Sequence, residues 1–118
     1  MSALVGGNAA LEPAPLGAHE SPSAIVARLA KYAQAMGWEV VRDSHLQTNC
    51  RRWNAAGTHT QWILLYGSDR TWQRDPSFSV AAETRSASGR FLQGGPMRAT
   101  TWSLLFSDVV RTLGTPRS

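Results

Sequence analysis

The stretch Thr58-His59-Thr60-Gln61-Trp62-Ile63-Leu64-Leu65-Tyr66 decides the fold of this chain. It is rich in β-branched and aromatic residues, which favour extended backbone, so we predict a central β-strand over 58–66. The preceding Asn54-Ala55-Ala56-Gly57 has the composition of a turn. A second, more polar strand is therefore expected over 46–53, paired with the central strand as an antiparallel hairpin.

Three further strands are predicted outward from this hairpin, because short extended patterns recur on both sides of it. The segment 67–76 between the third and fourth strands is expected to be a loop. Gly94-Gly95-Pro96 is expected to break any regular pattern. The three strands are a short one over 38–42, one in which Phe78, Val80 and Ala82 alternate, and a short fifth over 90–92.

Two amphipathic helices are predicted, one before and one after these strands in the sequence. The first is expected to begin after Ser21, a good N-cap, with Pro22 in its first position, and to end at Gly37. The second is expected to open at Thr100 or Thr101 and to end near Gly114 and Pro116. Their predicted apolar faces are Ile25, Val26, Leu29, Ala33 and Met36 in the first helix, and Trp102, Leu105, Phe106, Val109 and Leu113 in the second.

The order of elements predicts an α+β fold. We expect a two-layer sandwich in which a helix, an antiparallel meander of four or five strands and a second helix follow one another, with both helices on one sheet face. The 118 residues fit one compact domain, which we place over 21–118. Residues 1–20 are rich in Ala, Gly and Pro and are expected to form a flexible N-terminal tail.

Composition excludes several classes of protein. A single cysteine, Cys50, can form no internal disulfide and no thiolate-based zinc site. The longest apolar run, Trp62 to Tyr66, is too short to cross a bilayer, and the first residues lack the charge and apolar stretch of a signal peptide. We therefore expect a cytoplasmic protein that does not associate with membranes.

The chain is basic, with 12 Lys+Arg against 8 Asp+Glu and a formal net charge of +4. Lys31 is the only lysine, and such a preference for arginine is typical of a GC-rich genome, as found in some bacteria, plasmids or phages. Net positive charge favours nucleic acid as a partner, although arginine usage of this kind also produces an ordinary solubilising surface.

Alternation of side chains divides the predicted hairpin into two faces. A four-residue turn would pair Trp53 with Thr58 and, further along, His45 with Tyr66. The core face would then carry Leu46, Thr48, Ile63 and Leu65, together with Cys50. The opposite face would carry His45, Gln47, Asn49, Arg51, Trp53, Trp62, Leu64 and Tyr66.

This mixture of aromatic, amide and guanidinium groups predicts a binding surface. Aromatic rings and arginines on an open sheet can stack unpaired bases of RNA or DNA. The same face could instead dock a protein partner or a second copy of the chain, as in a dimeric accessory protein or a host-factor inhibitor, or be covered by the tail or the 67–76 loop. The candidate binding residues are Arg51, Trp53, Trp62, Tyr66, Arg70, Trp72 and Arg74.

The last three of these residues lie in the predicted loop. In extended form, Arg70, Trp72 and Arg74 would point to one side and suit phosphates that flank a stacked base. The alternative is a solvated loop with Trp72 packed against the sheet edge, where Asp69 and Asp75 offset part of the charge.

Catalytic motifs are few, which favours a non-enzymatic role. The three histidines, His19, His45 and His59, do not have the spacing of a metal site. The chain also lacks a phosphate-binding GxxxxGK loop and a GxSxG nucleophile elbow, and we expect neither a metal nor a cofactor. Parity places Cys50 on the core face, where a buried thiol is unreactive.

The segment Gly37-Trp38-Glu39-Val40-Val41-Arg42-Asp43-Ser44-His45, which follows an amphipathic helix and precedes a meander, resembles the start of HicA-type toxins. The resemblance implies an RNA-cleaving protein with a double-stranded-RNA-binding-like fold, in which His45 would be the catalytic residue. A histidine can act as general acid or base in such cleavage, because its pKa lies near neutrality.

Overall fold

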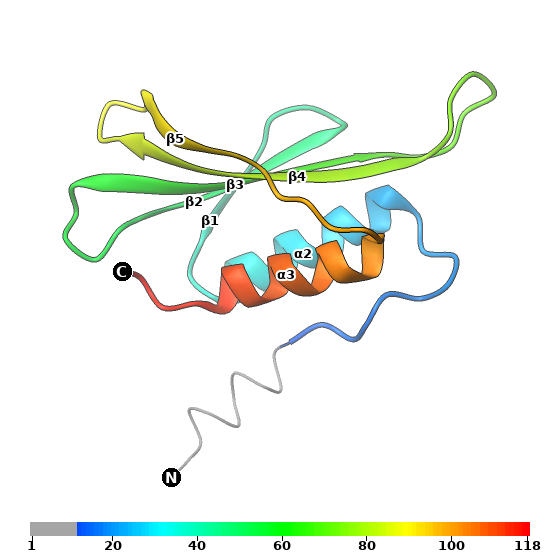
Figure 1. Ribbon diagram of the computed structural model, residues 1–118, viewed down its shortest axis with the longest axis horizontal. Coiled ribbons are helices and arrows are strands. Elements are labelled where there is room, and N and C mark those ends of the chain that lie inside the picture. Colours follow the sequence, from blue (N-terminus) through cyan, green and yellow to red (C-terminus); the bar gives the residue numbers. More distant parts are fainter. Residues whose placement is uncertain (1–11) are drawn as a thin grey trace, which may run out of the picture.

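The computed structural model describes residues 12–118 and has a helix, an antiparallel sheet and a second helix in that order (Figure 1). The predicted α+β class is confirmed, and the meander has five strands. The elements are α2 (Pro22–Ala35), β1 (Glu39–Arg42), β2 (Gln47–Trp53), β3 (His59–Ser68), β4 (Ser77–Ser86), β5 (Phe91–Pro96) and α3 (Trp102–Gly114).

The five strands form one open sheet in which each strand pairs with its neighbours in the sequence, in the order β1-β2-β3-β4-β5. Both helices lie against the same face of this sheet, as predicted (Figure 1). The described residues 12–20 run beside the helices, where Arg28 forms an ion pair with Glu20 at 2.6 Å and also contacts the Ala14 carbonyl. The predicted tail over 1–20 lies partly outside the described residues.

The β2–β3 register differs from the predicted one by two residues. Trp53 pairs with Thr60 rather than with Thr58, and Gln47 rather than His45 pairs with Tyr66. The reason is a longer turn: the Asn54 side chain accepts a hydrogen bond from the Thr58 backbone N–H at 2.8 Å, and this holds Thr58 outside the strand. Because the shift is an even number of residues, the predicted separation of the two faces is preserved in both strands.

Both helices begin as the sequence predicts. The Ser21 hydroxyl accepts a hydrogen bond from the Ala24 N–H and caps α2, and Thr101 caps α3 by accepting from the Leu104 N–H at 3.1 Å. After α2, Gly37 adopts a φ of 93°, which a glycine tolerates at a helix end.

The core fills the space between the helices and the covered face of the sheet. Both predicted helical faces contribute to it, and the sheet supplies Cys50, Ile63 and Leu65. Trp38 is an addition to the predicted core: it precedes β1, is buried, and donates its indole N–H to the Leu113 carbonyl at 2.9 Å. This bond ties the start of the sheet to the end of α3.

The segment Gly94-Gly95-Pro96 continues β5, so the prediction that it breaks the pattern is wrong. Gly94 pairs with Glu83 at a φ of 128°, a conformation that favours glycine, and its Cα lies close to the backbone of β4. The absence of a side chain at Gly94 thus allows β5 to approach β4 closely enough to pair with it. Among residues 12–118, no helix combines the length and apolar character that a membrane crossing requires.

Candidate functional site

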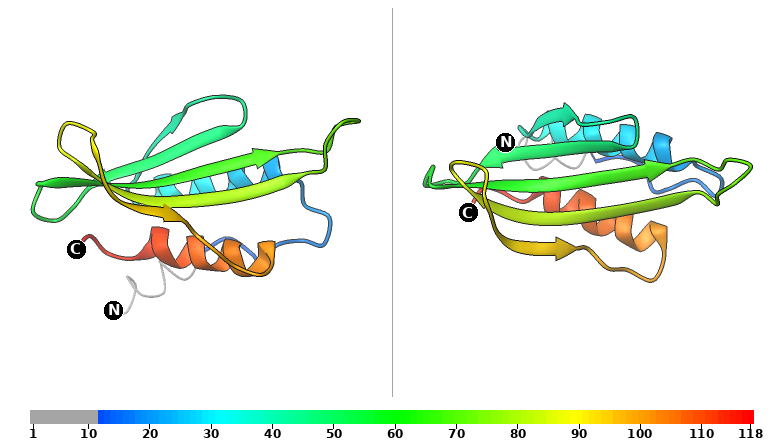
Figure 2. Two further views of the ribbon diagram at one scale, coloured as in Figure 1. Left: turned by 45° about the horizontal axis from the view of Figure 1, so that its top comes forward. Right: turned by 90° about the horizontal axis from the view of Figure 1, so that it is seen from above.

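No described segment of the chain covers the face of the sheet opposite the helices (Figure 2). Residues 12–20 lie on the helical side, and the connection between β3 and β4 extends beyond the end of the sheet (Figure 1). The predicted alternative in which these segments cover the open face therefore fails for residues 12–118. Strand pairing places Gln47, Asn49, Arg51 and Trp53 of β2 beside Thr60, Trp62, Leu64 and Tyr66 of β3 on this face.

Trp62 lies at the centre of a stack with two arginines. The Arg51 guanidinium carbon, on β2, lies 5.5 Å from the Trp62 ring centroid, and that of Arg85, on β4, lies 3.9 Å from a ring centroid of the same indole. The two arginines come from the strands on either side of β3. The Trp62 indole N–H donates to the Thr60 hydroxyl at 2.9 Å, which fixes the orientation of the ring. Trp62 is therefore held by cation–π contacts and is not an open stacking surface.

Each arginine of this stack has a carboxylate partner. Arg51 pairs with Glu39 of β1, and Arg85 donates to Glu83 through Nε at 2.9 Å and through Nη2 at 2.8 Å. The hydrogen bond from Arg51 lowers the pKa of Glu39, so this carboxylate stays ionised at neutral pH. The two pairs offset the positive charge at the centre of the open face, where sequence alone placed an unpaired guanidinium.

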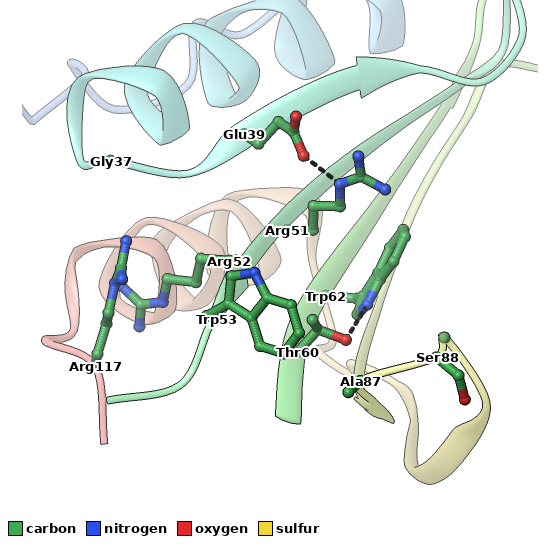
Figure 3. Close-up of a pocket in the computed structure, with 11 residues that line it drawn as sticks. Gly37, Glu39, Arg51, Arg52, Trp53, Thr60, Trp62, Ala87, Ser88 and Arg117 are labelled. Atoms are coloured by element: carbon green, nitrogen blue, oxygen red, sulfur yellow. Dashed lines mark hydrogen bonds and ion pairs between the residues drawn. The ribbon is translucent and has the colours of Figure 1, made fainter. Parts of the chain in front are cut away.

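A cleft of 480 Å³ lies at the end of the sheet, lined by the start of β1, the end of β2, the start of β3 and the β4–β5 turn (Figure 3). Trp53 is 45% exposed and stands in this cleft between two groups of side chains. Arg52 and Arg117 lie on one side of it, and Thr60 and Trp62 on the other (Figure 3). The remaining lining residues are Gly37, Glu39, Arg51 and the turn residues Ala87, Ser88 and Gly89. We call this the Trp53 cleft.

Positive charge exceeds negative charge in the Trp53 cleft, because three guanidinium groups share it with one carboxylate, Glu39. Desolvation lowers the pKa of Arg52, and the nearby charge of Arg117 lowers it further. Arg52 is nevertheless well held: its guanidinium carbon lies 4.2 Å from a Trp38 ring centroid, and its Nη2 donates to the Thr115 carbonyl at 2.8 Å. An anion in the cleft would relieve the repulsion between Arg52 and Arg117.

Arg52 and Arg117 are not among the binding residues that the sequence predicts. Arg52 lies on the face of β2 that carries Cys50, and Arg117 lies beyond the last helix. The Ala55 N–H donates to the Ser118 carbonyl at 3.1 Å, which brings the end of the described chain to the β2–β3 turn. The only available signal for Arg52 was its position beside Arg51 in the sequence, and nothing local indicated Arg117.

The structure separates the predicted binding residues into three places. Arg51, Trp53 and Trp62 share the Trp53 cleft. Tyr66 lies on the same face of β3 but four residues beyond Trp62, a distance of about 13 Å along the strand. Arg70, Trp72 and Arg74 lie in the β3–β4 connection, which starts after Ser68, about 20 Å beyond Trp62.

The connection between β3 and β4 ends in a closed turn and not in an extended segment. The Thr71 N–H donates to the Arg74 carbonyl at 3.0 Å, and the Thr71 hydroxyl accepts from the Arg74 N–H at 3.1 Å. Arg70 pairs with Asp75 at 3.4 Å. Trp72 is 91% exposed, so the alternative in which it packs against the sheet edge is wrong.

His45 lies apart from the open face, and its predicted position there is wrong. It belongs to the connection before β2, where the Ser44 hydroxyl accepts from the Leu46 and Gln47 N–H groups and interrupts the alternation of side chains. His45 lines a small cavity of 80 Å³ together with residues of α2, among them Val26 and Ala27. The catalytic role that the toxin resemblance implies for His45 remains a prediction.

Cys50 is buried, as predicted, and burial raises the pKa of its thiol to about 12. A thiol with this pKa is protonated at neutral pH and is a poor nucleophile. Among residues 12–118, no group of three or more His, Cys, Asp or Glu side chains is arranged to hold a metal ion.

Comparison of the chain with protein-family models, with curated proteins and with solved structures finds no match. The likeness to HicA-type toxins therefore rests on residues 37–45 and the order of elements alone. That family has three strands between its helices, whereas five strands occupy this position here.

Proposed function

We propose that this protein binds nucleic acid and that the Trp53 cleft is the binding site. The observation that carries the proposal is the composition of that cleft, which combines an accessible indole with three guanidinium groups and a single carboxylate in 480 Å³. An aromatic ring can stack on the face of a base, and guanidinium groups bind phosphate oxygens by charge-assisted hydrogen bonds.

We place the ligand on Trp53 rather than on Trp62, although both side chains line the cleft. The Trp62 ring is stacked by Arg51 and Arg85, and both arginines are paired with carboxylates. A base could stack on Trp62 only by displacing an arginine. Trp53 is 45% exposed, and Arg117 lines the same cleft.

The test is fluorescence anisotropy of a labelled mixed-sequence RNA, titrated with the full chain at low and at physiological salt. We expect binding that Trp53→Ala weakens between about 5-fold and 150-fold, because one base stack contributes roughly 1–3 kcal/mol. Trp72→Ala is the matched control, since it removes an exposed indole at the far end of the sheet, and it should leave the affinity unchanged. Absence of binding at low salt would overturn the proposal.

A protein-interaction module is the second candidate, and the observation that favours it is the β3–β4 turn. Trp72 is 91% exposed there, and the two acidic residues Asp69 and Asp75 equal the two arginines Arg70 and Arg74 in number. A neutral turn with one exposed indole resembles the aromatic anchors of protein interfaces. This function predicts self-association or a complex that Trp72→Ala disrupts and that moderate salt leaves intact. Sedimentation equilibrium of the natural protein and of Trp72→Ala tests the self-association directly.

A further inference from the structure

Three of the polar side chains that line the Trp53 cleft, those of Arg52, Thr60 and Trp62, already use a donor in a bond within the protein. The Trp62 indole N–H donates to the Thr60 hydroxyl, and that hydroxyl donates to the Arg85 carbonyl at 3.3 Å. The Nε of Arg52 donates to the Gln61 amide oxygen at 2.7 Å. Recognition of a particular base requires donors and acceptors that are placed in fixed positions and free to bond.

Two accessible side chains of the cleft, those of Trp53 and Arg117, have free donors, but within residues 12–118 no hydrogen bond holds these donors in fixed positions. Trp53 offers a ring, and every base has an aromatic face that can stack on it. Arg117 offers a positive charge, and every nucleotide has a phosphate. Among residues 12–118, Arg117 has neither a carboxylate partner nor a side-chain hydrogen bond.

A base inside a duplex cannot use this arrangement. Its two faces are covered by the neighbouring base pairs, so stacking on Trp53 requires a base that is unpaired or at the end of a strand. The Trp53 ring lies in a cleft between the strand ends and the β4–β5 turn, and a rigid double helix would have to lose a base pair before one of its bases could enter.

We infer that the Trp53 cleft recognises unpaired nucleotides of any sequence, with the base on Trp53 and the phosphate at Arg117. This inference rests on the proposed function and assigns the class of its ligand. The cleft would bind single strands without a preferred base and would bind intact duplexes poorly.

The experiment compares labelled decamers of the four DNA homopolymers, dA, dC, dG and dT, with a blunt duplex of mixed sequence, all at one low salt concentration. We expect the dA, dC and dT dissociation constants to agree within about 5-fold and the duplex to bind at least about 10-fold more weakly. The dG decamer is annealed with Li⁺ to keep it single-stranded and is expected in the same range. Trp53→Ala should weaken all four single strands by a similar factor, and Trp72→Ala should weaken none of them.

The outcomes separate the inference from the proposed function. A preference of more than about 10-fold for one base, lost in Trp53→Ala or in Arg117→Gln, would overturn the inference and leave nucleic-acid binding intact. Binding of the duplex with an affinity equal to or higher than that of the single strands would also overturn the inference and leave nucleic-acid binding intact. Uniform binding that Trp53→Ala leaves unchanged would place the ligand elsewhere and refute the cleft as its site. Binding of the mixed-sequence RNA but of none of the DNA single strands would overturn the inference and leave the proposed function intact. Failure of both the RNA and every DNA probe to bind would refute the proposed function itself.

Discussion

Trp62→Ala should destabilise the fold even though Trp62 lies on the open face of the sheet. The ring is partly buried between Arg51 and Arg85, and we take about 100 Å² of apolar contact as lost on truncation. At about 25 cal/mol per Å², this loss corresponds to about 2.5 kcal/mol. The two cation–π contacts add about 0.5–1 kcal/mol each at a partly exposed site. Relaxation of the two arginines offsets part of this sum, so we expect a loss of about 3 kcal/mol.

Urea denaturation followed by circular dichroism measures this loss. The slope of the unfolding free energy is about 1–3 kcal/mol per molar urea for a domain of this size, so the midpoint should fall by between about 1 and 3 M. Trp72→Ala removes the same side chain from a position that is 91% exposed and should change the unfolding free energy by less than about 0.5 kcal/mol. If the two variants unfold at the same urea concentration, the stack contributes no stability and the reasoning fails.

Three further predictions concern the backbone, a charged contact and the core. Gly94→Ala should destabilise the fold by about 2–5 kcal/mol in the same urea assay, because the added Cβ would lie 2.7 Å from the Glu83 Cα and the φ of 128° disfavours alanine. The control is Gly95→Ala, whose Cβ would meet nothing within 4 Å and which should change stability by less than about 1 kcal/mol. Equal losses of stability in the two variants would contradict the predicted clash. Hydrogen bonds from the Ser23 hydroxyl and N–H lower the pKa of Asp69 below its ordinary value of 3.8, so the carboxylate stabilises the fold above that pH and this contribution is lost as the pH falls through the folded-state pKa. The difference in melting temperature between the natural protein and Asp69→Asn should therefore be largest near neutrality and shrink below about pH 4, and a difference independent of pH would refute the role of the charge. Cys50, with a pKa of about 12, should resist iodoacetamide at pH 8 in the folded protein and react in urea, as measured by intact mass; rapid modification of the folded protein would show that the thiol is accessible.

The sequence predicts the arrangement of elements because the signals for it are local. Ser21 and Thr101 cap the two helices through hydrogen bonds that span three residues, and apolar spacing identifies both buried faces. The register of the hairpin is a less local property. It depends on whether the Asn54 side chain holds Thr58 in the turn, and composition alone does not distinguish that turn from a shorter one.

The site is predicted less completely because its residues come from distant parts of the chain. Arg51, Trp53 and Trp62 belong to one hairpin, and alternation along its strands predicts that they lie together. Arg85 joins them through the β3–β4 pairing, and Arg117 through the contact between Ser118 and Ala55. Neither contact leaves a pattern in the sequence near these arginines.

Pairing of charges explains why the basic composition of the chain is a poor guide to its binding surface. The +4 net charge suggests a broad basic face, yet Arg51 and Arg85 are paired with Glu39 and Glu83 on the open face of the sheet. Only Arg52 and Arg117 add unpaired charge at the Trp53 cleft. A single strand bound there would have about two phosphates neutralised by these arginines. The logarithm of the association constant should then fall with the logarithm of the salt concentration with a slope of about −1.4. A much steeper slope would mean that arginines outside the cleft bind the strand, and a basic surface would then replace the cleft as the principal determinant of binding.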